Sequence, residues 1–502
     1  MSHQGRCSTP CGSPDFSQLT PMTKPLSHFI AGAAVGSTGT DLLLDLNPSD
    51  ARDVVAEVPV GTAADAAAAV AAASAALPAW RSLTGPARAE YLHKWAAAIQ
   101  DRAEEIAQAM AREVGKPIGE ARGEVGRCIV ILRYYAGDAV RSVGEVVPAQ
   151  AAGALQFTLR EPLGVVALIT PWNFPVAIPL WKAAPALAFG NTVVLKPSEQ
   201  SPLMALLLAE TAQAAGLPAG VFNVLLGTGA GVGEPLLRAP EVRGISFTGS
   251  AAVGARVAAI ATERNVRYQT EMGGKNVVIV MPDADLDLAA KLTAAGAMRF
   301  AGQKCTATSR AVVFPEVESA FLEKVREQVE GFTMGPVTDP ACAIGPVINA
   351  GSRQRIWDAL GATRAEVVCG GVEVTGVVFK RGFFVTPTVV RGVDPGTPLA
   401  QEELFGPVLA VSSASTLDDA LTIANNSRYG LSASLFTRDI GAALRYIQRI
   451  DVGLVRINGD TTGVDPHAPF GGMKGSSSGS REQGTAAREF YTETKTVQVN
   501  PV

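Results

Sequence analysis

The regular alternation of short apolar runs with helix-like segments between residues 164 and 270 constrains the fold most strongly. Four runs have the length and residue types of buried strands: Val165–Thr170, Asn191–Lys196, Val221–Leu226 and Val242–Phe247. The segments of helical type between and after them are Val176–Phe189, Leu203–Ala215 and Ser250–Thr262. Repeated βα units predict a parallel sheet with right-handed crossovers, and such sheets bind ligands beside the carboxyl ends of their strands. We therefore predict an α/β fold with a binding site along one edge of this sheet.

Other segments surround this unit. A second αβ region is expected from Gly274 to about Ala486, with strands at Asn276–Met281 and Ala311–Phe314 and helices at Leu286–Ala301 and Val317–Gly331. Upstream, helices are expected over Thr62–Leu77, Pro86–Val114 and Pro117–Ala136.

Two further segments have the pattern of exposed strands. Val143–Leu159 is predicted to form an extended hairpin with a Gly- and Ala-rich middle. In the tail, Phe490–Val502, β-branched residues alternate with polar ones, which indicates a strand. A terminal strand needs a partner, so we expect it to pair with this hairpin or with another subunit.

Length and charge limit the classes of function. A chain of 502 residues predicts two or three domains. The net charge of −4, without a clustered basic stripe, gives no reason to expect a nucleic-acid partner. We expect no membrane span, because no apolar run reaches the roughly 18–20 residues that one needs.

The cysteines, histidines and N-terminal segment give three further expectations. The six cysteines are scattered in no zinc or disulfide pattern, which favours a reducing, cytoplasmic setting. The four histidines lie far apart, so we expect no metal site. Met1–Pro25 is polar and rich in Ser, Pro and Gly, and we expect a disordered extension without a secretory signal.

Cys305 is the first of three candidate catalytic residues, and it lies between a predicted helix and a predicted strand. A reactive cysteine needs a positive neighbour or a general base, because the thiolate is the nucleophile. Lys304 is adjacent, and the following residues can present free N–H groups. The alternative, a buried structural cysteine, stays open on this segment alone.

Glu271 and Asn173 are the other two candidates. Glu271 lies among Tyr268, Met272 and two glycines, where burial would raise its pKa and suit it to activate water. A salt-bridged or exposed glutamate is the alternative. Asn173 follows a strand in a segment stiffened by two prolines, so its amide can donate to a developing oxyanion or simply stabilise its own turn.

Candidate cofactor contacts follow the strands of the first sheet. Lys196 and Glu199 stand at a strand end, where they can bind ribose hydroxyls or form a solvated end with a capped helix. The segment from Phe247 to Ser250 joins a strand to a helix and can face a pyrophosphate. The glycine-rich Gly227–Gly233 does not satisfy G-x-G-x-x-G, because position 232 is valine.

In this order along the chain, these segments resemble the aldehyde dehydrogenase superfamily. Glu403-Leu-Phe-Gly-Pro407 and Pro469-Phe-Gly-Gly-Met-Lys-Gly475 add to a resemblance that covers nearly the whole chain after about His28. The resemblance implies a Rossmann-like cofactor domain (26–141 and 161–272), an α/β catalytic domain (273–485) and a small β oligomerisation flap (142–160 and 486–502). It also implies a homodimer or homotetramer.

The resemblance implies the following roles. Cys305 would attack the aldehyde, the Asn173 amide and the Cys305 N–H would hold the oxyanion, and Glu271 would activate water to hydrolyse the thioester. NAD is the implied cofactor, because Glu199 should repel the 2′-phosphate of NADP, although some relatives with this glutamate accept both. The implied cofactor contacts are Ile169, Thr170, Pro171, Trp172, Lys196, Ser198, Glu199, Gly229, Phe247, Thr248, Gly249, Ser250, Val253, Met272, Gly273, Glu403 and Phe405.

For the substrate, the segments around Cys305, Gly463-Val-Asp-Pro-His-Ala-Pro469 and Arg481-Glu-Gln-Gly484 look like α-ketoglutaric semialdehyde (2,5-dioxopentanoate) dehydrogenases. Arg299 lies six residues before Cys305, where semialdehyde dehydrogenases often bind the far carboxylate of the substrate. Arg299 can instead bond a neighbouring loop, and Trp181 stands where succinic semialdehyde dehydrogenases carry a second arginine. The implied substrate contacts are Phe174, Trp181, Arg299, Lys304, Thr306, His467 and Phe470.

Three alternatives remain. Trp181 can form an apolar wall that suits simple aliphatic or aromatic aldehydes. The chain can be a non-catalytic protein on the same fold, although such relatives tend to lose the nucleophile. It can also transfer the acyl group to coenzyme A, although Glu271 points to hydrolysis, because members that use coenzyme A commonly lack this base.

Overall fold

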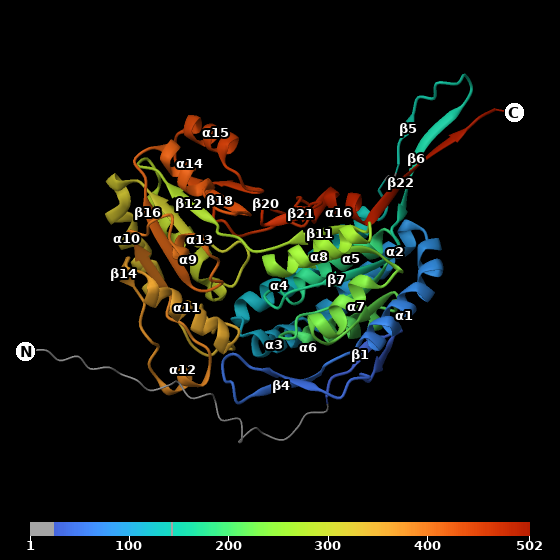
Figure 1. Ribbon diagram of the computed structural model, residues 1–502, viewed down its shortest axis with the longest axis horizontal. Helices are drawn as coiled ribbons and strands as arrows, with labels where there is room; N and C mark the ends of the chain where they lie inside the picture. Colours follow the sequence, from blue (N-terminus) through green and yellow to red (C-terminus); the bar gives the residue numbers. More distant parts are fainter. Residues whose placement is uncertain (1–24, 142–143, 502) are drawn as a thin grey trace, which may run out of the picture.

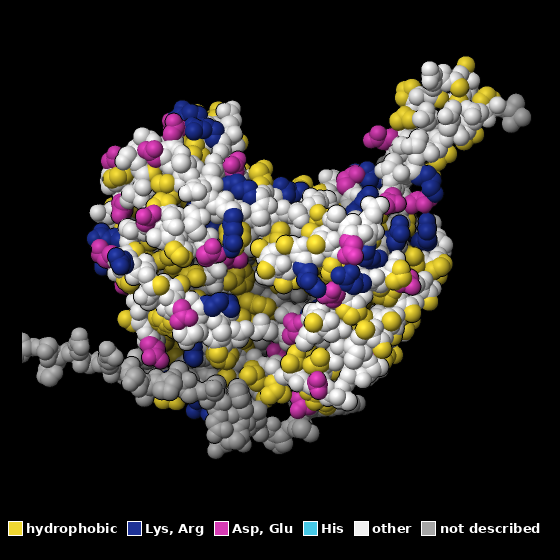
Figure 2. All heavy atoms as spheres, viewed as in Figure 1, with side chains coloured by type: hydrophobic (Ala, Val, Ile, Leu, Met, Phe, Trp, Pro, Cys, Tyr) yellow, Lys and Arg dark blue, Asp and Glu magenta, His cyan; other side chains and the backbone are white. Residues whose placement is uncertain are grey.

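Two mixed sheets with helices packed on them form the body of the molecule, and a long three-stranded arm projects from it (Figure 1). The structure is a computed structural model that describes residues 25–141 and 144–501. The predicted α/β fold class is confirmed. On the face shown in Figure 2, Lys and Arg side chains are interspersed with Asp and Glu.

The first sheet contains the predicted βα units. Its order is β2 (Ala33–Val35), β1 (His28–Ile30), β9 (Phe222–Val224), β8 (Thr192–Lys196), β7 (Val165–Ile169), β10 (Val242–Thr248), β11 (Arg267–Glu271) and β21 (Ser477–Gly479). Strands β9, β8, β7, β10 and β11 run parallel to one another. β1 pairs antiparallel with β9 on one side of this set, and β21 pairs antiparallel with β11 on the other. The apolar strands are continuous because helices cover this sheet on both faces.

The second sheet is built from the region after Gly274. Its order is β14 (Glu366–Cys369), β15 (Thr388–Arg391), β16 (Val408–Ser413), β13 (Arg310–Val313), β12 (Val277–Val280), β18 (Ser432–Phe436) and β19 (Leu454–Ile457). Only β14 pairs antiparallel in it. The predicted strands at 276–281 and 311–314 are thus β12 and β13, two neighbours at the centre of the sheet.

Helices and short pairs complete the fold. The helices of the first half are α1 (Ala63–Ser82), α2 (Gly85–Asp101), α3 (Ala103–Val114), α4 (Ile118–Asp138), α5 (Ala177–Ala188), α6 (Pro202–Ala214), α7 (Glu234–Arg238) and α8 (Ala251–Glu263). Those of the second half are α9 (Leu286–Met298), α10 (Pro315–Glu330), α11 (Ala350–Ala362), α12 (Val377–Arg381), α13 (Pro398–Gln401), α14 (Leu417–Asn425), α15 (Ile440–Arg449) and α16 (Gly484–Tyr491). Two small pairs are β3 (Leu42–Leu46) with β4 (Val54–Pro59), and β17 (Tyr429–Gly430) with β20 (Met473–Lys474).

Three predicted helices are wrong in their extent. The helix predicted over Thr62–Leu77 is α1, which continues through Pro78 to Ser82. The segment 86–114 is not one helix, because Arg102 leaves helical geometry (φ −108°, ψ 17°) and separates α2 from α3. Its guanidinium pairs with Glu105 and Glu210, so the break is held by side-chain contacts that no helical pattern reveals. The helix predicted to reach Ala301 ends at Met298 and continues as a short 3₁₀ turn, η2 (Arg299–Gly302).

The expectation that no apolar run is long enough for a membrane span needs correction at α1. This helix is long and apolar enough to cross a membrane by length and composition alone. In the structure its small side chains Ala69, Val70 and Ala73 are buried in one core cluster with Val165 and Val194 of the first sheet. Its apolar stripe therefore belongs to the core that supports the sheet.

The C-terminal strand pairs with the predicted hairpin. β22 (Thr492–Val499) runs antiparallel to β6 (Leu155–Pro162), which also pairs with β5 (Val146–Val147). Figure 1 shows this sheet projecting from the body. The tail strand begins at Thr492, because Phe490 and Tyr491 end helix α16. The predicted extension Met1–Pro25 lies outside the described residues except for Pro25, as do residues 142–143 and 502.

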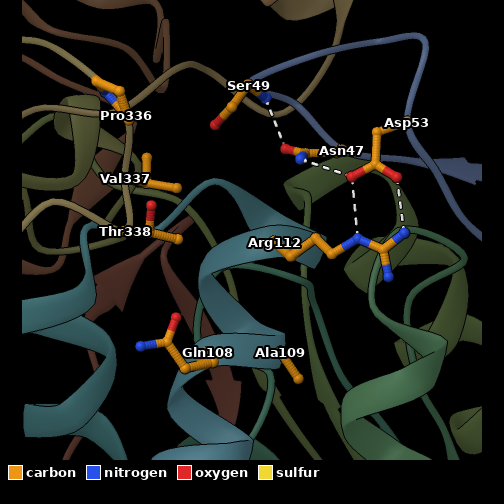
Figure 3. A pocket seen from close by; sticks show the side chains of 9 residues that line it. All are labelled: Asn47, Ser49, Asp53, Gln108, Ala109, Arg112, Pro336, Val337 and Thr338. Atoms are coloured by element: carbon orange, nitrogen blue, oxygen red, sulfur yellow. Dashed lines mark hydrogen bonds and ion pairs between the residues drawn. The ribbon is translucent and has the colours of Figure 1, made fainter.

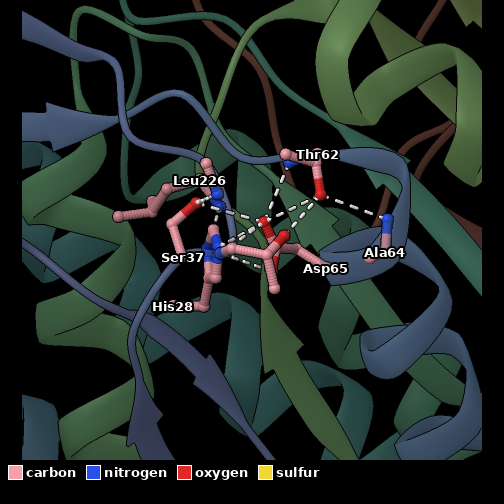
Figure 4. Close-up of polar contacts among 8 residues, drawn as sticks. His28, Ser37, Thr62, Ala64, Asp65 and Leu226 are labelled. Carbon is pink, nitrogen blue, oxygen red and sulfur yellow. Dashed lines mark hydrogen bonds and ion pairs between the residues drawn. The ribbon is translucent and has the colours of Figure 1, made fainter.

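A buried polar cluster joins β1, the start of α1 and the end of β9 (Figure 4). Asp65 accepts hydrogen bonds from the N–H groups of Thr62 and Thr38, and His28 Nε2 lies 3.4 Å from Asp65 Oδ2. His28 Nδ1 accepts the N–H of Leu226 at 3.1 Å, directly before the glycine-rich segment. Burial acts to raise the pKa of Asp65, but the hydrogen bonds outweigh it and bring the pKa to about 2.

We expect Asp65→Ala to lower the free energy of unfolding by about 2 kcal/mol, because it breaks the capping box of α1 and leaves the partly buried N–H groups of Thr38 and Thr62 without this acceptor. The measurement is the midpoint of urea unfolding at neutral pH. Asp41→Ala, at an exposed side chain, is the matched control and should leave the midpoint unchanged. Equal midpoints for the two variants would contradict a stabilising role for this cluster.

Candidate active site

The carboxyl ends of four parallel strands form one row in the first sheet. Lys196 ends β8 and pairs in register with Ile169 of β7, which pairs with Phe247 of β10. On the other side of β10, Thr248 pairs with Glu271 at the end of β11. Neighbouring strands lie about 4.8 Å apart, so three steps separate Lys196 from Glu271 by roughly 15 Å. The structure thus brings together residues that were predicted from separate segments.

Several buried polar groups along this edge have no hydrogen-bond partner in the part of the chain that the structure describes. Within the described residues, the buried Thr170 Oγ1, Thr248 Oγ1 and Glu271 Oε1 have no hydrogen-bond partner. At the far end of the row, Lys196 Nζ donates to Glu199 Oε1 at 2.6 Å. Buried groups of this kind usually find a partner, so the row has free donors and acceptors for a polar ligand.

The predicted strand-to-helix turns are packed tightly. The Ser250 hydroxyl accepts the N–H of Val253 and begins α8, while Thr228 caps a π-helical turn, η1 (Gly229–Gly233). A Cβ on Gly249 would lie 2.6 Å from the Phe247 ring. Met272 is 8% exposed, whereas Val253 is 50% exposed. The Ser198 hydroxyl accepts the N–H of Gln200 and shapes the turn after Lys196.

The Cys305 loop has an unusual backbone. After α9, Phe300, Ala301 and Gly302 all lie in the left-handed region, with φ of 53°, 50° and 67°. Such residues are strained unless the surroundings hold them, and strain of this kind clusters at functional sites. Here Gln303 is fully buried and bonds Phe300 O, Pro346 O and the N–H of Ile348.

Asn173 lies against this loop. Its Nδ2 donates to the carbonyl of Gln303 at 3.0 Å, and its own carbonyl accepts Lys116 Nζ at 2.7 Å. The side chain is 3% exposed. Among the described residues Nδ2 has no second acceptor, so one amide hydrogen remains available beside the Cys305 loop. The predicted alternative, an asparagine that bonds only its own turn, does not describe these contacts.

Glu271 is 1% exposed and lies at the site end of β11. Its Oε2 accepts the hydroxyl of Ser477 on the neighbouring β21. Burial and then the negative charge of Glu482 raise its pKa well above the ordinary value, against opposing effects of Ser477, Lys182 and Arg481. The alternative of an exposed or directly salt-bridged glutamate is wrong.

Glu403 approaches from the second sheet. Its Oε1 accepts the N–H of Gly274 at 3.0 Å, and a Cβ on Gly273 would lie 1.9 Å from Oε2, so a side chain there would displace the Glu403 carboxylate. Burial raises the pKa of Glu403 to about 7. The Phe405 ring stands edge-on to Trp172, with centroids 5.6 Å apart.

Cys305 is partly exposed, yet protein atoms surround it densely. Burial, followed by the charges of Glu403 and Glu271, raises the pKa of its thiol to about 12, against hydrogen bonds from the N–H groups of Thr306 and Cys305. Glu403 and Cys305 both adjoin Gly274, because Glu403 Oε1 accepts its N–H and a Cβ there would lie 3.0 Å from the Cys305 carbonyl oxygen. The positive neighbour predicted at Lys304 is wrong in this role, because Lys304 Nζ pairs with Glu120 at 2.9 Å.

The predicted substrate residues divide into two groups. Trp181 stacks near Phe470, with centroids 5.7 Å apart, and Phe174 packs near Phe300. Arg299 and His467 are exposed, and the Arg299 side chain makes no hydrogen bond or ion pair with any described residue, although its backbone N–H donates to Ala295 O. The alternative in which Arg299 bonds a neighbouring loop is therefore wrong. Thr306 is buried, and its carbonyl accepts the hydroxyl of Thr461.

Sequence reasoning missed a buried ionic cluster behind Glu271. Lys182 Nζ pairs with Glu482 Oε1, and Trp181 Nε1 donates to Glu482 Oε2 at 2.8 Å. Lys182 is the single charged residue of the otherwise apolar helix α5, and that isolation was the available signal. The Trp181 indole is consequently anchored by a carboxylate and is not a purely apolar wall.

A surface cleft lies elsewhere, between β3–β4, α3 and the loop at residues 336–338 (Figure 3). It has a volume of about 500 Å³ and is crossed by the ion pair of Arg112 with Asp53. None of the predicted site residues lines it. The candidate site therefore rests on the convergence at Cys305, not on this cleft.

Comparison with known proteins gives a consistent result. The model of the aldehyde dehydrogenase family matches residues 36–497. An α-ketoglutaric semialdehyde dehydrogenase of Bacillus subtilis is 45% identical over 477 residues, which cover 94% of this chain and 98% of the relative. An α-ketoglutarate semialdehyde dehydrogenase of Haloferax volcanii is 41% identical, with 95% of this chain and 99% of the relative covered.

A solved structure shares the fold. The betaine aldehyde dehydrogenase of Staphylococcus aureus in complex with NAD+ superposes with a TM-score of 0.91 at 33% identity. The match covers 95% of each chain.

Proposed function

Because this chain belongs to the aldehyde dehydrogenase family and is an aldehyde dehydrogenase, we propose that it oxidises a semialdehyde bearing a carboxylate, such as α-ketoglutaric semialdehyde, with NAD+. The balanced reaction is aldehyde, NAD+ and water to carboxylic acid, NADH and a proton. One observation carries the proposal: the Asn173 amide donates to the Gln303 carbonyl, two residues before Cys305, and Glu403 accepts the N–H of Gly274, which lies against the Cys305 carbonyl.

The residues supply the steps as follows. The thiol must lose its proton to solvent before it attacks the aldehyde carbon, because the thiolate is the nucleophile. The Asn173 amide and the Cys305 N–H would hold the oxyanion of the thiohemiacetal. After oxidation leaves a thioester on Cys305, Glu271 Oε1 would take a proton from the water that hydrolyses it.

The carboxyl edge of the first sheet suits a dinucleotide. The unsatisfied hydroxyls of Thr170 and Thr248 and the packed turn at Gly249 lie between Lys196 and Glu271. Lys196 and Glu199 would bind the adenosine ribose, Trp172 and Ser250 the pyrophosphate, and Glu403 with Phe405 the nicotinamide ribose. When bound, NAD+ supplies the hydride acceptor. Glu199 favours NAD over NADP, because its charge would repel a 2′-phosphate.

Arg299 supports a carboxylate on the substrate. Its guanidinium is exposed, makes no hydrogen bond or ion pair with the described residues, and belongs to the first residue of the turn that leads to Cys305. A guanidinium can grip a carboxylate through two parallel hydrogen bonds. The two relatives named as semialdehyde dehydrogenases agree with this substrate class.

We expect Arg299→Ala to lower kcat/KM for α-ketoglutaric semialdehyde by about 10- to 100-fold, because a charge-assisted contact is lost. Oxidation of pentanal, which has no carboxylate, should be unchanged. The measurement is NADH absorbance with both aldehydes, and Arg364→Ala at an exposed arginine is the control. An equal loss for both aldehydes would reject a selective anchor.

Simple aliphatic or aromatic aldehydes are the second candidate substrates. The stacking of Trp181 near Phe470 favours them, since these rings can contact an apolar chain. In the same assay this alternative predicts a higher kcat/KM for pentanal or benzaldehyde than for the semialdehyde in the unmodified enzyme.

We also propose a role for each of three parts of the chain. Residues 26–141 and 161–272 would form the cofactor domain, and 273–485 the catalytic domain. Segments 142–160 and 486–502 would mediate a homodimer or homotetramer, because the β5–β6–β22 sheet leaves the body and exposes strand edges. The described cysteines are free, which supports the proposed cytoplasmic setting.

A further inference from the structure

Three charged residues at the start of α4 reach the two loops that meet at the candidate site. Lys116 precedes the helix, and Glu120 and Glu124 lie one turn apart on it. Their partners belong to the Asn173 segment and the Cys305 loop, which are far away in sequence. We call Lys116 and Glu124 the α4 pair.

Lys116 touches both loops. Its Nζ donates to the carbonyl of Asn173 at 2.7 Å and pairs with Glu124 Oε2. The same ammonium lies 4.1 Å from the ring centroid of Phe174 and 4.3 Å from that of Phe300. Phe174 follows Asn173, and Phe300 stands in the strained turn before Cys305, so one positive group bridges the two loops.

Glu124 holds the other side of the Asn173 segment. Its Oε1 accepts the N–H groups of Val176 and Ala177, both at 3.0 Å, at the first turn of α5. The side chains of both members of the α4 pair are 1% exposed. A fully buried ion pair has a high desolvation cost and is often no more stabilising than apolar residues, so stability alone explains its presence poorly.

Glu120 adds a contact from the same helix to the nucleophile loop. Its Oε2 pairs with Lys304 Nζ at 2.9 Å, directly beside Cys305. Helix α4 thus contacts the Cys305 loop through one carboxylate and the Asn173 segment through the α4 pair. The separation between the amide and the sulfur depends on both sets of contacts.

We propose that the α4 pair is a positioning device: Lys116 and Glu124 hold the Asn173 amide against the Gln303 carbonyl, at the place where it meets the oxyanion formed on Cys305. This inference rests on the proposed function of Asn173. Neither residue touches substrate, and both act through the backbone of the Asn173 segment. A misplacement of about 1 Å in such a donor is enough to cost about 100-fold in rate.

The test uses the double substitution Lys116→Met/Glu124→Gln in the full-length enzyme, which removes the ion pair without leaving a single buried charge. The first-turnover rate of NADH formation should fall by about 10- to 100-fold. KM for the aldehyde and Kd for NAD+ should stay within about twofold, because ground-state binding is not altered. In an Asn173→Ala background, the double substitution should cause no further loss.

Arg264→Met is the matched control for structural damage. Arg264 is partly buried and bonds the carbonyls of Leu237, Ala239 and Val242 at the far end of α8. Its loss should lower the melting temperature without changing the first-turnover rate. If the double variant does not fold, Glu124→Gln alone replaces it. The test is then whether Glu124→Gln slows the first turnover in the wild-type background but not in the Asn173→Ala background.

The outcomes separate the two proposals. If Asn173→Ala retains the normal first-turnover rate, the proposed oxyanion role fails. If Asn173→Ala is slow but the α4 variant is as fast as wild type, the positioning inference is overturned. The positioning inference is also overturned if the α4 substitutions slow the first turnover equally in the wild-type and Asn173→Ala backgrounds. The α4 pair would then affect the rate by a route that does not involve the Asn173 amide.

Discussion

Cys305→Ala removes aldehyde oxidation, and we expect kcat to fall by about 10⁴-fold or more, as for other enzymes that lose their covalent nucleophile. The reason is that the proposed reaction passes through a covalent adduct on this sulfur, and the other described cysteines, Cys128, Cys342 and Cys369, lie on other segments. The measurement is NADH formation, with NAD+ binding by calorimetry to show that the cofactor edge is intact.

Thiol labelling tests the same site independently. With a thiol pKa of about 12, alkylation of Cys305 by iodoacetamide in the cofactor-free enzyme should rise about tenfold per pH unit between pH 7 and 10, because only the thiolate reacts. Cys369→Ala, at a partly buried cysteine on β14, should leave both labelling at residue 305 and turnover unchanged. Normal turnover by the Cys305→Ala variant would reject the thioester chemistry.

Glu271→Gln should slow thioester hydrolysis by about 10²- to 10³-fold, because the amide cannot accept a proton from water. The first turnover should still release about one NADH per subunit, so a burst followed by a slow phase is the expected trace. Glu263→Gln, at an exposed glutamate of α8, is the control. If turnover of the variant required coenzyme A, or if both phases were normal, hydrolysis by Glu271 would be refuted.

The pH dependence has a definite sign. The pKa of Glu271 is raised, and the carboxylate is the active form, so hydrolysis should increase as pH rises through this pKa and be lost as pH falls. Ser477→Ala removes a hydrogen bond that opposes the shift, so it should move the profile to higher pH. The Glu271→Gln variant should lose this pH dependence.

Much of the first sheet was predictable because its information is local. Strands β7, β8 and β10 are buried on both faces, so each is a continuous apolar run that is visible in the sequence. The pairing of β22 with β6 could be predicted only as one of two alternatives, the hairpin of the same chain or another subunit. A terminal strand shows that it needs a partner but not which partner it has.

The helix ends were less predictable because distant contacts decide them. At Arg102 no proline or glycine interrupts the helical pattern, yet the guanidinium binds Glu210 of another helix. The left-handed turn at Phe300 and Ala301 is held by neighbours such as Gln303 and Pro346, and local propensity opposes it.

The segments around Asn173, Glu271 and Cys305, taken in order with the other motifs of the chain, were sufficient to indicate the class of chemistry through a family resemblance, and the alternation of apolar runs with helices indicated the α/β fold. Only the tertiary structure decided the electrostatics. Lys304 pairs with Glu120, while Lys182 and Glu482 lie behind Glu271, and two carboxylates raise the thiol pKa. The physical reason is that charge interactions and desolvation depend on distance in space, and these groups come from separate segments of the chain.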